Sequence, residues 1–147
     1  MKYFTMSQFA TALDATARGM PKRIGLKLYE LAEFIQKEAQ GYIGHPQDDW
    51  DSLAQSTIAL KNRSGYGSKG PLDRTGEMRQ SITFRVYPFE AIVESFNRAL
   101  YFHETGTIYM PKRPVLSRAV MRNEKMIALI LGRAVNPLFG KYKMWWV

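Results

Sequence analysis

The sequence of 147 residues contains no cysteine, only two histidines and no long apolar run. Without cysteine the chain forms no disulfide and offers no thiolate to a metal ion, so nothing ties it to an oxidising compartment. The start of the chain lacks the continuous apolar stretch of a signal peptide, and no segment approaches the ~18 apolar residues of a membrane span. We therefore expect an unprocessed, soluble protein that is made in the cytoplasm.

Two histidines leave few means of catalysis. A nucleophile needs a base that a third group holds in place, and neither His45 nor His103 lies in such a motif. The pair His103-Glu104 begins like a zinc-binding helix, but Thr107 stands where the second histidine would follow. The acidic stretch at residues 48–51 lacks the glycine and the distal glutamate of a calcium loop. We predict no enzyme, no catalytic residue, no metal and no cofactor, and only a pair of carboxylates that meet in space stays open as an alternative.

Positive charge is concentrated in the second part of the chain. Residues 1–60 carry six Lys/Arg against seven Asp/Glu, whereas residues 61–147 carry fifteen against six, and the formal net charge is +8. This excess favours a polyanionic neighbour, although a solvated basic surface explains it equally well.

Apolar residues at helical spacing predict helices in the N-terminal part. The first covers residues 7–18, and the second covers about 24–39 after a break at residues 19–21, because the proline there suits the first turn of a new helix. A third helical stretch is expected near residues 49–61, with Asp49 or the aspartate before it as the N-cap.

Alternating apolar and polar residues predict a β-hairpin from strands 81–87 and 91–96. A short helix over residues 97–104 and a short strand over residues 107–110 should follow.

The last helical face runs from about residue 114 to residue 135 and is interrupted only at Asn123-Glu124. With 46% hydrophobic residues the chain has the composition of one globular domain, residues 1–147. We predict an α+β fold in which N-terminal helices and a long C-terminal helix pack on a small antiparallel β-sheet.

Two segments belong to none of these elements. Residues 62–71 are rich in glycine, but the glycine spacing is not that of a phosphate-binding loop, so a flexible loop is expected. Residues 139–147 combine aromatic side chains with two lysines. This tail is expected to pack on its own domain or to insert into a neighbouring subunit, and the two alternatives stay open.

Three short stretches, in this order, resemble elements of the neck and tail-completion proteins of long-tailed double-stranded DNA phages. They are LDRTGEMRQSI at 72–82, FHETGT at 102–107 and MPKRPVL at 110–116. Phe102 replaces the usual tyrosine, Val115 replaces a phenylalanine, and residues 48–70 match nothing in the pattern. These departures leave open to which subfamily of these proteins the chain is most similar, and hence which ring of the neck or tail it would form.

Local chemistry is consistent with the same elements. Thr75 can cap the turn that begins at Gly76, and Met78 can pack against the strand that follows. The prolines at 111 and 114 force residues 112–113 into an extended bend, because a residue before proline avoids the α region. The Arg113 guanidinium held there is expected to bind a carboxylate of its own fold or of the next subunit.

The resemblance implies a structural virion protein, one subunit of a closed and hexameric ring at the head-to-tail connection, through which phage DNA passes. Its partners would be further copies of the chain and other neck and tail proteins, and it would reside in the host cytoplasm during assembly and in the virion afterwards. The alternatives are a tail terminator or minor tail subunit, and a small basic nucleic-acid-binding protein that acts outside the virion. The residues expected to face DNA through non-specific phosphate contacts are Lys61, Arg63, Lys69 and Arg74. Those expected at subunit interfaces are Lys112, Arg113, Tyr142, Trp145 and Trp146.

Overall fold

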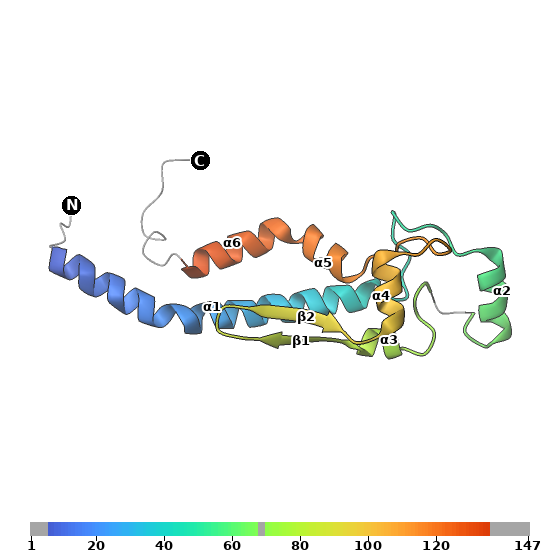
Figure 1. The fold of residues 1–147 in the computed structure, drawn as a ribbon, viewed down its shortest axis with the longest axis horizontal. Coiled ribbons are helices and arrows are strands. Elements are labelled where there is room, and N and C mark those ends of the chain that lie inside the picture. Colours follow the sequence, from blue (N-terminus) through green and yellow to red (C-terminus); the bar gives the residue numbers. More distant parts are fainter. Residues whose placement is uncertain (1–5, 68–69, 136–147) are drawn as a thin grey trace.

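The computed structural model describes residues 6–67 and 70–135 and confirms the α+β class (Figure 1). The body is elongated, and α1 packs against a β-hairpin and against α5 and α6. In chain order the elements are α1 (Met6–Tyr42), α2 (Gln55–Arg63), α3 (Glu77–Gln80), β1 (Ile82–Val86), β2 (Ala91–Ser95), α4 (Arg98–Thr105), α5 (Leu116–Arg122) and α6 (Glu124–Val135).

The N-terminal region is one continuous helix, so the expected break at residues 19–21 is wrong. Pro21 lies inside α1. Proline removes one hydrogen bond of a helix and bends it, and Figure 1 shows that the axis of α1 changes direction within its blue part. The apolar positions before and after Pro21 follow one helical face in the sequence, from Leu13 through Ala17 to Ile24 and Leu28. None of the described helices, α1 included, is apolar enough over a sufficient length to cross a membrane.

The hairpin forms as expected, but the sheet has only two strands in the described part of the chain. β1 and β2 pair antiparallel from Ile82–Ser95 to Val86–Ala91. The strand expected over residues 107–110 is not formed, because Thr107 and Met110 pair with each other across a tight turn. Each strand therefore keeps one unpaired edge within the described residues.

The core lies where the C-terminal end of α1 meets β1, α4 and α5. Its most deeply buried side chains are Ile43, Ile82, Leu100 and Val115. The C-terminal helical region divides into α5 and α6 at Asn123, as expected, and the Asn123 amide nitrogen donates to the Ala119 carbonyl oxygen at 2.8 Å.

Helix α2 begins later than expected, at Gln55, and it has no aspartate N-cap. The residues before it are held by the body of the protein: Trp50 is buried in the core, and Asp49 forms an ion pair with Arg118 of α5. The chain thus cannot start a helix at residue 49. None of the residues of α2 is buried.

Replacing a core side chain near the end of α1 should strongly destabilise the fold. Ile43 is fully buried, so Ile43→Ala should lower the free energy of unfolding by about 2–5 kcal/mol. Leu129→Ala, on the exposed side of α6, is the matched control and should change it by about 0.5 kcal/mol or less. Urea denaturation followed by circular dichroism measures both, and similar losses in the two variants would contradict the assigned core.

Candidate functional site

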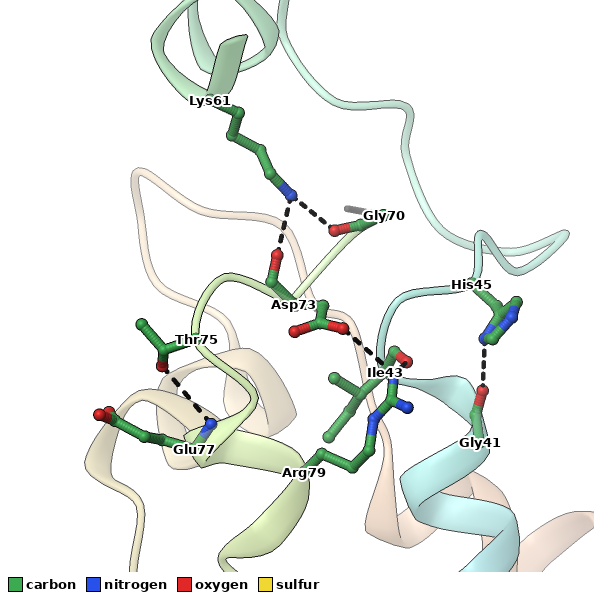
Figure 2. A network of polar contacts seen from close by, with 9 residues as sticks. All are labelled: Gly41, Ile43, His45, Lys61, Gly70, Asp73, Thr75, Glu77 and Arg79. Atoms are coloured by element: carbon green, nitrogen blue, oxygen red, sulfur yellow. Dashed lines mark hydrogen bonds and ion pairs between the residues drawn. The ribbon is translucent and has the colours of Figure 1, made fainter. Parts of the chain in front are cut away.

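Residues 72–82, the first of the three stretches, cap the C-terminus of α1. Arg79 extends from α3, and its Nη2 donates to the carbonyl oxygen of Ile43 at 2.5 Å (Figure 2). The same nitrogen lies 3.2 Å from Asp73 Oδ2, so this carboxylate fixes the guanidinium. The last carbonyl groups of a helix lack partners inside it, and a cation there also opposes the negative end of the helix dipole.

The turn before α3 has the expected form. Gly76 adopts a left-handed conformation with φ +85°, and Thr75 Oγ1 accepts a hydrogen bond from the Glu77 N–H at 3.4 Å (Figure 2). Met78 is half-buried and packs on the core cluster that contains Ile82. Both expectations for this turn are confirmed.

Lys61, which we expected to face DNA, is engaged within the chain. Its Nζ donates to the carbonyl oxygens of Gly70 at 2.6 Å and Asp73 at 3.0 Å (Figure 2). The backbone it holds lies against the end of α1, since a Cβ on Gly70 would stand 1.8 Å from the Gly44 oxygen. The structure thus gives Lys61 a bracing role, and its contact with DNA stays a prediction.

The other expected DNA contacts differ in their surroundings. Arg63 and Arg74 are exposed, and the Arg74 guanidinium lies 5.6 Å from the centre of the Tyr66 ring. Lys69 lies outside the described residues. Contact of these arginines with DNA stays a prediction.

The second and third stretches are joined by Glu104, which caps the N-terminus of α5. Its Oε1 accepts from the N–H groups of Val115, at 2.8 Å, and Leu116, and its Oε2 accepts from Ser117 Oγ at 2.7 Å. The first N–H groups of a helix lack partners inside it, and a carboxylate there is favoured by the dipole. α5 has no N-cap side chain of its own, so a residue of α4 supplies the cap.

Arg113 lies inside the protein rather than on a surface. It is 8% exposed, and its Nη2 donates to the Asp51 carbonyl oxygen at 2.9 Å. Its backbone N–H donates to the His103 carbonyl oxygen at 2.8 Å. Arg113 is therefore braced within one chain, but by a backbone carbonyl oxygen and not by the carboxylate that we expected, and its place at a subunit interface stays a prediction. Lys112 is exposed, whereas the interface residues expected in the tail lie outside the described residues: Tyr142, Trp145 and Trp146.

The capped elements enclose a cleft of about 830 Å³. One wall is α2, and the others are residues 72–78, α4 and residues 109–113. All three stretches therefore contribute to this cleft, and we call this region of the molecule the motif end. Large apolar side chains are exposed around it: Leu60 64%, Tyr101 63%, Ile108 89% and Tyr109 91%.

His103 borders the cleft, and its side chain is half-buried there. Burial, together with the neighbouring Arg113 guanidinium, lowers the pKa of His103 below its usual range. No hydrogen-bond partner for its Nδ1 exists among the described residues. Within those residues, no three side chains of His, Asp or Glu gather in a way that would hold a metal ion.

The sequence did not reveal the roles of Arg79 and Glu104. Both lie in the recognised stretches, but their partners are backbone atoms 36 and 11 or 12 residues away in the sequence. The only signals were indirect: a helix C-terminus without a basic residue and a helix start without a capping side chain.

Removing the Glu104 cap should destabilise the fold. Glu104→Ala leaves two N–H groups without a partner and should cost about 1–3 kcal/mol, whereas Glu104→Gln keeps an acceptor and should cost less. Glu90→Ala, at the exposed turn of the hairpin, is the control. Chemical denaturation measures all three, and equal stabilities of the Glu104→Ala and Glu90→Ala variants would refute the cap.

The lowered pKa of His103 makes stability depend on pH. Unfolding returns this pKa to about 6.5, so the unfolded chain takes up the proton first as the pH falls. Stability should therefore be greatest above about pH 6.5 and decline from there toward the lower pKa of the folded state. His103→Gln should weaken this decline between pH 7.5 and 5.5 in urea titrations. His45→Gln, which keeps His103, should retain it, and an unchanged decline in His103→Gln would exclude the assignment.

No protein-family model, no curated protein and no solved structure matches this chain. The fold and the motif end therefore have to be interpreted from their own residues. What these offer is a cleft lined by both apolar and charged side chains, a rim of exposed apolar side chains and two exposed arginines.

Proposed function

We propose that this protein is a structural subunit of the neck or tail end of a long-tailed DNA phage and forms a closed ring with further copies of itself. It works by contact with its neighbours and converts no substrate. The resemblance of residues 72–82, 102–107 and 110–116 suggested this function, and the structure supports it by the role these stretches share. They hold one end of the molecule rigid and display apolar side chains there.

The observation that carries the proposal is that α2 buries none of its residues within its own chain. A helix of nine residues is marginal in water, because most helix stability comes from packing an apolar face. α2 nevertheless carries Ile58 and Leu60, which are 36% and 64% exposed. A neighbouring subunit would supply the missing surface.

The turn beside the cleft leads to the same conclusion. Ile108 and Tyr109 are about nine-tenths exposed, and the turn that carries them is fixed by the Thr107–Met110 pair. Exposed apolar groups in a rigid setting are typical of protein interfaces. The hairpin adds two unpaired strand edges, and closing a ring by head-to-tail contacts is one way to cover such edges.

Arg63 and Arg74 provide the link to DNA in this proposal. Both are exposed near the motif end, so a ring that turns this end inward would present them to the passing duplex. Such contacts would be non-specific and weakened by salt. Lys61, also selected for this role, braces the backbone of Gly70 and Asp73 as well.

Native mass spectrometry combined with negative-stain imaging tests the proposal. The purified chain should form a ring of six copies with a central hole that admits duplex DNA. Leu60→Asp and Tyr109→Asp should weaken assembly by roughly tenfold or more, because each places a charge in the contact. Leu129→Asp, on exposed α6, should assemble normally.

A chain that stays monomeric at high concentration would overturn the ring. If such a monomer bound DNA with a steep dependence on salt, the alternative of a nucleic-acid-binding protein outside the virion would replace it.

A further inference from the structure

The cleft is lined by α2 and α4, and these helices lie away from the last turn of α6 (Figure 1). The cleft lies beyond the C-terminal end of α1, between α2 and α4. α5 starts beside it and α6 continues away from it, so that the last turn of α6 lies over the blue part of α1 (Figure 1). The tail that follows α6 carries Phe139, Tyr142, Trp145 and Trp146.

The tail of a chain is poorly placed to fill the cleft of the same chain. The seven residues of α5 and the twelve of α6, at about 1.5 Å each, carry the chain roughly 28 Å away from the cleft. Full extension from Val135 reaches about 14 Å at Phe139 and about 25 Å at Tyr142. Phe139 falls short of the cleft, and Tyr142, Trp145 and Trp146 would reach it only in a chain stretched almost straight back.

The cleft has the chemistry to receive aromatic side chains. Apolar side chains come from three of its walls, among them Leu60, Leu72 and Met110. A buried indole also needs an acceptor for its N–H. Asp73 Oδ1, in the cleft wall, is buried and has no hydrogen-bond partner among the described residues. The volume of about 830 Å³ falls in the range of sites that enclose a ligand.

We propose that residues 139–147 of one copy dock in the cleft of the next copy. This inference rests on the proposed ring and names the contact that closes it. A donor segment that follows α6 and an acceptor cleft between α2 and α4 make a head-to-tail contact, which repeats around a ring and can also cover α2.

Cross-linking tests this contact, and the absence of natural cysteine removes any background. A tagged chain with Met144→Cys, which keeps every aromatic residue of the tail, is mixed with an untagged chain. The untagged chain carries Ala99→Cys or Thr57→Cys, both exposed positions that line the cleft. Ala128→Cys, exposed on α6, is the matched control. Oxidised glutathione serves as the oxidant.

The expected result is a disulfide-linked heterodimer with Ala99→Cys or Thr57→Cys, at least roughly tenfold more abundant than with Ala128→Cys. A ring seen by mass without any preferred heterodimer would overturn the inference and leave the proposed function intact. A cross-link that forms only within the doubly substituted chain, Met144→Cys with Ala99→Cys, would place the tail in its own cleft. A strict monomer without cross-links would overturn both proposals.

Blocking the cleft provides an independent measurement. Ala99→Trp should fill part of the cleft and weaken assembly by roughly tenfold or more, whereas Ala128→Trp should not. Circular dichroism establishes that both variants fold. Equal assembly of the two folded variants would count against docking in the cleft.

Discussion

Two charged side chains cap helices to which they do not belong, and the arrangement of the motif end depends on them. Arg79 satisfies the carbonyl end of α1, and Glu104 satisfies the N–H end of α5. In each case the charge has the sign that the helix dipole favours, and hydrogen bonds to charged groups stabilise by about 1.5–3 kcal/mol. The caps tie α3 to α1 and α4 to α5. Four elements are thus joined around one core by polar contacts at their ends.

The elements joined by these caps form a frame, and other side chains remain exposed around it. Lys61 and Arg113 extend the frame, since both use their charge on backbone carbonyl groups of distant segments. The apolar side chains left outside include Ile58 and Leu60 on α2 and Ile108 and Tyr109 on the turn at residues 107–110.

The sequence predicted what depends on local pattern and failed where distant contacts decide. The alternation of apolar and polar residues located the hairpin. Asn97 and Gly106 marked the two ends of α4 closely. Pro21 was misread because its penalty is local, whereas the apolar face that continues α1 is set by the whole helix. Arg113 was expected to bind a carboxylate, but its partner is the Asp51 carbonyl oxygen, which lies 62 residues away. No spacing rule specifies such a pair.

Charge sets the conditions under which copies of this chain can meet. Each carries a formal +8, so neighbours in a ring would repel one another, and apolar contacts would have to drive closure. Salt screens that repulsion, and salt also weakens contacts with phosphate groups. Raising the ionic strength therefore pushes ring closure and DNA binding in opposite directions. A chain whose main task is binding DNA loses its function in salt, whereas one that works by self-contact keeps its assembly.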